Sequence, residues 1–136
     1  MSLKSKFKTN TSLINDGVWF DVVVNPDGTK CRVKLRRTGP ANALWSLAWR
    51  ERESENTEAL TPDEDRAFMA GVYADAVVAD WEHMQPEDDG KDWAFNRDNV
   101  VKLLGNAEWL EFRNWVREKA DSLAPFQDKR EEEAKN

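Results

Sequence analysis

The acidic turn Glu87–Gly90 comes nearest to a metal-binding motif, because carboxylates followed by glycine occur in calcium-binding loops. With Gly90 at the sixth position of such a loop, the first and last ligands would be Gln85 and Asn96, where the motif requires carboxylates. Magnesium-dependent phosphoryl transfer would also need a glycine-rich phosphate loop, and the sequence contains none. We therefore predict a solvated acidic turn and no cofactor.

Histidine and cysteine chemistry is limited, because His83 and Cys31 are each the single residue of their type. A single histidine excludes a site with two imidazoles, and a single cysteine excludes an internal disulfide and a cysteine-rich zinc site. No nucleophile–base pair can be assembled, so we predict that the protein is not an enzyme. We expect His83 to end a helix, whose last carbonyls favour a cation.

Tryptophan is the most informative residue type, with seven in a chain of 136 residues. Trp45 and Trp49 are four apart and share a helical face next to Leu44, whereas Trp109 and Trp115 are six apart and cannot both face a core without a wide apolar stripe. Exposed tryptophan is enriched where proteins bind partners, although most rings of a small domain belong to its core. These five residues are therefore our partner-binding candidates, and we expect Trp49 to be more exposed than Trp45.

A row of basic side chains suggests a second kind of surface. Lys30, Arg32, Lys34 and Arg36 alternate with apolar residues, so they share one face of a strand. Such a face can contact nucleic-acid phosphates, but the chain carries a net charge of −6, which opposes binding. We favour a solvated strand face and expect no nucleic-acid partner, with a small nucleic-acid-associated protein as the alternative.

The distribution of charge and apolar residues predicts one domain. Residues 1–37 hold eight basic and three acidic residues, net +5, and the remaining 99 hold 12 basic and 23 acidic, net −11. We predict a flexible basic arm over residues 1–16, a single α+β domain over 17–126 and a disordered charged tail over 127–136. No apolar run resembles a secretory signal or a membrane span, which predicts a cytosolic protein with no membrane partner.

The domain is expected to begin with a β-hairpin. Residues 18–24 are β-branched and aromatic, residues 25–28 read Asn-Pro-Asp-Gly, and residues 30–36 alternate strictly between apolar and basic side chains. Pro26 presets the first turn position, and Gly28 supplies the positive φ that closes the turn.

Helical signals follow the hairpin. An apolar stripe over residues 44–49 predicts a helix that frays in the charged run 50–55, and Thr61 with Glu64 forms a capping box for a helix running to about His83. A short helix is expected from Asn96 to a glycine cap at position 105, followed by a last helix to about residue 123. The sequence therefore predicts an α+β fold, mostly helical, with an N-terminal hairpin and a bundle of about four helices.

The order of several landmarks along residues 17–126 matches a known pattern. They are Trp19, Asp27-Gly28, Leu35-Arg36, Trp81, Asp89-Gly90, Phe95, Asn99, Leu103-Leu104, Trp109 and Trp115. In this order the chain resembles the tail assembly chaperones of long-tailed double-stranded-DNA bacteriophages.

The resemblance implies a non-enzymatic morphogenesis factor. It would bind the long helical tape-measure protein, keep it soluble, act in the host cytoplasm and be absent from the mature virion. A longer form made by translational frameshifting would recruit tail-tube protein through an extra C-terminal domain, and we expect this chain to be the short form. Self-association is a further hypothesis about its partners.

Overall fold

The structure is a computed structural model that describes residues 2–55 and 60–128. Its elements are, in order, α1 (Leu3–Phe7), α2 (Thr11–Asp16), β1 (Val18–Val24), β2 (Lys30–Leu35), α3 (Ala43–Glu55), α4 (Pro62–Ala76), β3 (Val78–Glu82), α5 (Arg97–Leu104), the 3₁₀ turn η1 (Ala107–Trp109), α6 (Leu110–Asp121) and the 3₁₀ turn η2 (Ala124–Phe126).

The predicted hairpin is present as strands β1 and β2. They pair antiparallel, with Phe20 opposite Val33 and a bulge between Asp21 and Val23. At the turn, the amide of Gly28 donates to the Asn25 carbonyl at 2.9 Å, and Gly28 adopts the expected positive φ of 87°.

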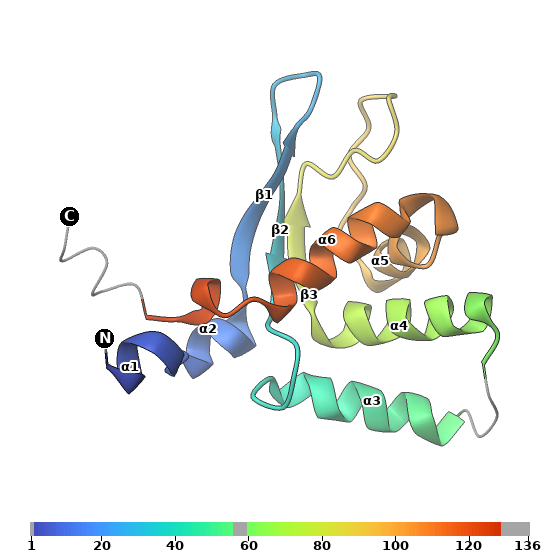
Figure 1. Cartoon of the computed structure of the whole chain (residues 1–136). Helices are drawn as coiled ribbons and strands as arrows, with labels where there is room; N and C mark the ends of the chain where they lie inside the picture. Colours follow the sequence, from blue (N-terminus) through green and yellow to red (C-terminus); the bar gives the residue numbers. More distant parts are fainter. Residues whose placement is uncertain (1, 56–59, 129–136) are drawn as a thin grey trace.

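A third strand stands where the sequence analysis predicted a helix up to His83, and that prediction is wrong. Helix α4 ends at Ala76, and β3 then pairs antiparallel with β2 to give the sheet order β1-β2-β3 (Figure 1). The apolar spacing of this segment fits either structure, but pairing with β2 places Trp81 opposite Val33 and buries both side chains. Long-range pairing thus overrides local helical spacing.

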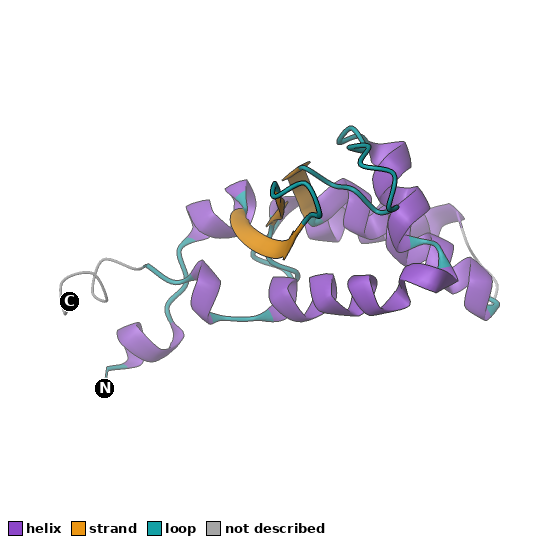
Figure 2. Ribbon diagram, turned by 90° about the horizontal axis from the view of Figure 1, so that it is seen from above, coloured by secondary structure: helices purple, strands orange, loops and turns teal. Residues whose placement is uncertain are grey.

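The core lies between one face of the sheet and helices α4, α5 and α6. Cys31, Val33 and Leu35 of β2 are buried there with Val72 of α4 and Leu103 of α5. Figure 2 shows α6 running along one side of the sheet. The architecture confirms the predicted α+β class, with four helices, α3 to α6, following the hairpin.

Two predicted helix starts and one predicted end are confirmed. The Thr61 and Glu64 amides exchange hydrogen bonds with each other's side chains, both at 3.2 Å, and Asn96 caps α5 through the Asn99 amide. Helix α5 ends at Leu104, and a Cβ at Gly105 would lie 2.7 Å from the Val101 carbonyl oxygen, so glycine is required there.

Helix α3 extends further than predicted. It continues to Glu55 instead of fraying in the charged run 50–55. Its start is fixed by Asn42, whose side chain is 0% exposed. The side-chain Nδ2 of Asn42 donates to the carbonyls of Arg37 (2.9 Å) and Ala76 (2.8 Å), and its Oδ1 accepts from the backbone amide of Leu44 at 2.9 Å. One side chain therefore caps α3 and ties it to the end of α4.

Two short helices replace the flexible arm predicted for residues 1–16. Ile14 of α2 and Phe126 of η2 are both 0% exposed, and the Asn10 amide donates to the Phe126 carbonyl at 2.8 Å. Burial of Ile14 supplies the apolar contact that a polar arm would lack, so α2 is part of the domain. Most of the tail predicted to be disordered, residues 129–136, lies outside the described residues.

Candidate functional site

Metal chemistry finds no support in the part of the chain that the structure describes. No group of three or more histidine, cysteine, aspartate or glutamate side chains there is placed to hold an ion. His83 does not end a helix as predicted, because it follows β3, with a positive φ of 52°. Its Nδ1 lies 3.4 Å from Asp92 Oδ2.

The acidic turn Glu87–Gly90 is exposed. The side-chain amide of Gln85 connects the surrounding loop to the hairpin turn. Gln85 Nε2 donates to Asp27 Oδ2 at 3.0 Å and to Asp92 Oδ1 at 2.7 Å. The bond from Gln85, with bonds from the side chain and backbone of Thr29, lowers the pKa of Asp27 from 3.8 to about 2. Asp27 thus acts as a hydrogen-bond acceptor that joins two turns.

Trp45 and Trp49 hold α3 against α4. The Trp45 ring lies 5.9 Å from that of Trp49 and 6.2 Å from that of Tyr73, and Trp49 lies 5.2 Å from Phe68. Both tryptophans are half-buried. The expectation that Trp49 is the more exposed of the two stays a prediction. The shared face predicted from their spacing is correct, and it points to α4.

The basic strand face is matched by acidic neighbours. Arg32 contacts Asp21 of β1 and Glu82 of β3, each at 3.1 Å, and its guanidinium lies 5.0 Å from the Trp19 ring centre. Lys34 stands opposite Asp80 in β3, and Arg36 Nε donates to the Asn15 carbonyl at 2.9 Å. The third strand, which the sequence analysis missed, thus places acids among the cations and weakens the attraction of this face for phosphates.

Apolar side chains gather on another surface, which we call the β1–α6 face: Phe20, Val22 and Val23 of β1 with Phe112 and Trp115 of α6. The Trp115 ring stacks on Phe112 with centres 6.0 Å apart and meets Phe20 edge-on at 6.3 Å. Val23 is 59% exposed although it stands opposite the buried Cys31, because the hairpin extends beyond α6 (Figure 1). Phe20, Val22, Phe112 and Trp115 are half-buried and pack against the core, so Val23 is the exposed member of this face.

The remaining candidates lie elsewhere. Trp109 of η1 is half-buried and packs against the core, and Leu44, at the start of α3, is 38% exposed. The sequence analysis therefore found one member of the β1–α6 face, Trp115, and missed the others. The run of three valines at 22–24 was an available signal, because a strand with alternating faces cannot bury all three.

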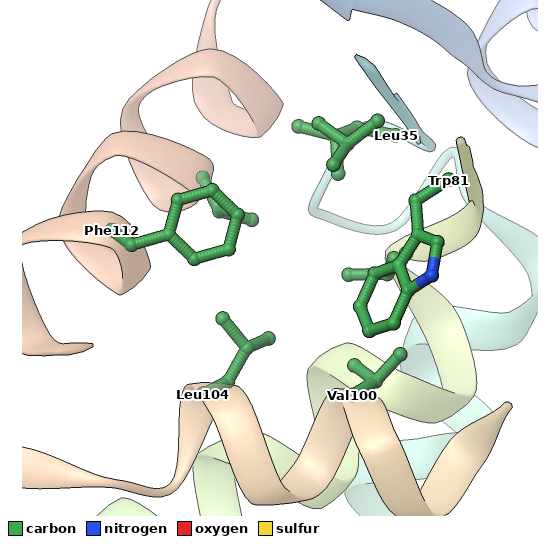
Figure 3. Close-up of a pocket in the computed structure, with 8 residues that line it drawn as sticks. Leu35, Trp81, Val100, Leu104 and Phe112 are labelled. Carbon is green, nitrogen blue, oxygen red and sulfur yellow. The ribbon is translucent and has the colours of Figure 1, made fainter. Parts of the chain in front are cut away.

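A small cavity of about 10 Å³ lies between the sheet, α5 and α6 (Figure 3). It is lined only by apolar side chains, namely Val33, Leu35, Val78, Trp81, Val100, Leu104, Phe112 and Val116. Its volume is close to the smallest that can hold one water molecule, but the lining side chains offer no group that could form a hydrogen bond with water. We interpret it as a dry packing gap beneath α6.

These features define an α+β protein whose candidate site is the β1–α6 face, where exposed Val23 borders half-buried aromatic rings. No helix among the described residues has the length and apolar character needed to cross a membrane. A sequence model of the YdaY prophage protein family matches residues 40–136, most of the chain, and the chain therefore belongs to that family. It is thus a phage-derived protein. No curated protein and no solved structure matches it.

Proposed function

We propose that this member of the YdaY prophage protein family is a non-enzymatic tail assembly chaperone that binds the tape-measure protein. Phage origin agrees with the resemblance of the landmark residues to such chaperones. The observation that carries the proposal is the β1–α6 face, where exposed Val23 extends the half-buried pair of Phe20 and Trp115. The chaperone would act in the host cytoplasm and leave before the virion matures.

The partner in this proposal is a helical segment with an apolar stripe. Val23 lies three residues beyond Phe20, about 10 Å along an extended strand, which is close to two turns of a helix. An apolar stripe on the partner would thus span from Trp115 to the free end of the hairpin. The rings supply a large contact area at low entropic cost, as is typical of protein-binding surfaces.

The nucleic-acid alternative is less well supported. Its candidate face carries four cations, namely Lys30, Arg32, Lys34 and Arg36. Three carboxylates on the neighbouring strands, Asp21, Asp80 and Glu82, offset most of this positive charge. Contact with tail-tube protein through a longer frameshifted form stays a further part of the chaperone proposal.

Co-expression with the tape-measure protein encoded by the same prophage tests the proposal. We expect the chain to raise the soluble fraction of tape-measure protein and to co-purify with it. A tape-measure protein that stays insoluble and does not co-purify would refute the chaperone function.

Two neighbouring valines supply a matched pair for testing the surface. Val23 and Val24 are 59% and 65% exposed, but they stand opposite Cys31 and Lys30 and so project from opposite faces of the sheet. We expect Val23→Asp to abolish co-purification and Val24→Asp to retain it. Equal effects of the two substitutions would refute the assignment of this face while leaving the chaperone function open to other surfaces.

A further inference from the structure

The hairpin turn meets both ends of the loop that follows β3, at one end of the sheet (Figure 1). Asn25 Nδ2 donates to the His83 carbonyl at 2.9 Å, so the turn is bonded to the start of the loop. The Trp93 amide donates to the Met84 carbonyl at 2.7 Å, which closes the loop on itself. We call this meeting place the turn junction, and it consists of residues 25–29, 83–85 and 92–93.

One side-chain nitrogen of the turn junction holds two carboxylates. Gln85 Nε2 donates to Asp27 Oδ2 at 3.0 Å and to Asp92 Oδ1 at 2.7 Å. Because both bonds come from the same nitrogen, the two negative charges lie close together, and a neutral amide cannot offset their repulsion. A cation beside them would therefore strengthen the junction.

His83 is placed to supply that cation. Its Nδ1 lies 3.4 Å from Asp92 Oδ2, and its electrostatic effect extends to Asp27 of the hairpin turn. The neighbouring charged residue of β3, Glu82, is paired with Arg32 at 3.1 Å. The loop and the hairpin turn thus each place an acid near the His83 ring.

The backbone of His83 also depends on the turn junction. Its φ is positive, at 52°, a conformation that is uncommon for a residue other than glycine and persists only where surrounding contacts hold it. Two such contacts are the bond from Asn25 to its carbonyl and the approach of its ring to Asp92. A weaker contact of the ring would therefore favour a relaxed backbone and an open junction.

We propose that the turn junction is a pH-sensitive switch, which protonation of His83 strengthens and deprotonation weakens. Histidine is the side chain whose charge ordinarily changes between about pH 5 and pH 8, and His83 is the only histidine in the sequence. Carboxylates ordinarily stay ionised throughout that range, so Asp27 and Asp92 remain available to the cation. The switch involves no partner, so it does not depend on the proposed chaperone function.

Amide hydrogen exchange, followed by NMR at about pH 5.5 and about pH 8, tests the switch. The Trp93 amide reports on the turn junction, and the Arg36 amide, which donates to the Val77 carbonyl at 2.7 Å, is the internal control away from it. After correction for intrinsic exchange rates, we expect protection of the Trp93 amide to be about threefold greater at the lower pH, a size typical of an exposed ion pair. Protection of the Arg36 amide should be the same at both pH values.

Three variants assign the effect to the charges. Asp92→Asn removes the negative charge but keeps an oxygen that can accept from Gln85, whereas Asp88→Asn removes a charge from an exposed position of the same loop. We expect Asp92→Asn to abolish the pH dependence of Trp93 protection and Asp88→Asn to retain it. His83→Asn should also abolish it, because asparagine tolerates a positive φ but cannot gain a charge. Equal protection at both pH values in the wild type, or an undiminished rise in Asp92→Asn or His83→Asn, would overturn the proposal.

Discussion

Replacing Asn42 by alanine should be among the most damaging single changes to a polar residue of this chain. The substitution removes three hydrogen bonds and leaves the Ala76 and Arg37 carbonyls and the Leu44 amide without this partner. Each bond contributes about 1 kcal/mol net, and a buried group left unpaired costs about 1–3 kcal/mol. Because Asn42 is 0% exposed, we expect the free energy of unfolding to fall by about 3 kcal/mol or more.

Asn15 provides a control with the same number of bonds. Its Nδ2 donates to the carbonyls of Thr11 (2.9 Å) and Ala41 (3.1 Å), and its Oδ1 accepts from the Ala43 amide (2.9 Å), all at exposed positions. Water can replace these bonds, so Asn15→Ala should cost only about 1 kcal/mol.

Urea unfolding followed by tryptophan fluorescence measures both variants. For a domain of this length, a loss of about 3 kcal/mol corresponds to a fall of about 10 °C in Tm. Asn42→Asp should be no better than Asn42→Ala, because a carboxylate has no donor for the two carbonyls. Equal destabilisation by Asn42→Ala and Asn15→Ala would refute the argument from burial.

Four further predictions concern pH, the rings, DNA and metals. The pKa of Asp27 in the folded protein is about 2, below its ordinary 3.8, so the ionised carboxylate stabilises the fold above about pH 4. This contribution disappears as the pH falls toward 2. In urea unfolding measured at several pH values, Asp27→Asn should therefore reduce the loss of stability between pH 4 and pH 2. Trp45→Ala and Trp49→Ala should lower Tm through loss of the α3–α4 contact, while binding of the tape-measure protein by the folded fraction persists in a pull-down. A gel-shift assay at about 150 mM salt should detect no DNA binding, and micromolar affinity would revive the nucleic-acid alternative. Calcium, magnesium, zinc and chelator should leave Tm unchanged, whereas a shift of several degrees would reveal a native-state metal site.

Local signals in the sequence predicted much of the fold. The Asn25–Gly28 turn, the Thr61 capping box and the Gly105 helix end each depend on a few neighbouring residues, so their chemistry can be recognised without knowing the tertiary contacts. The α+β class followed from them, since a hairpin and four helices were visible as separate patterns.

Features that depend on distant partners were not predictable in the same way. Strand β3 exists because β2 pairs with it, and α2 is ordered because Ile14 and Phe126 both become buried. Asn42 links α3 to the end of α4 because its side chain donates a hydrogen bond to the Ala76 carbonyl, 34 residues away. Nothing in the local sequence of these segments specifies the partner.

The candidate surface was only partly predictable for the same reason. Helical spacing correctly grouped Trp45 with Trp49, but it cannot say that this shared face meets α4 rather than solvent. Trp115 joined the β1–α6 face because β1, far away in sequence, brings Phe20 to it. Aromatic content therefore suggested a candidate surface, and tertiary packing decided which rings lie on it.

The most direct test of the proposed function is the affinity of the purified chain for a soluble fragment of the tape-measure protein from the same prophage. Binding measured by titration calorimetry for the wild type, Val23→Asp and Val24→Asp compares two similarly exposed positions on opposite faces of one strand. We predict that Val23→Asp weakens binding at least about tenfold and that Val24→Asp leaves it unchanged. A wild-type chain that binds no fragment of the tape-measure protein would contradict the chaperone function itself.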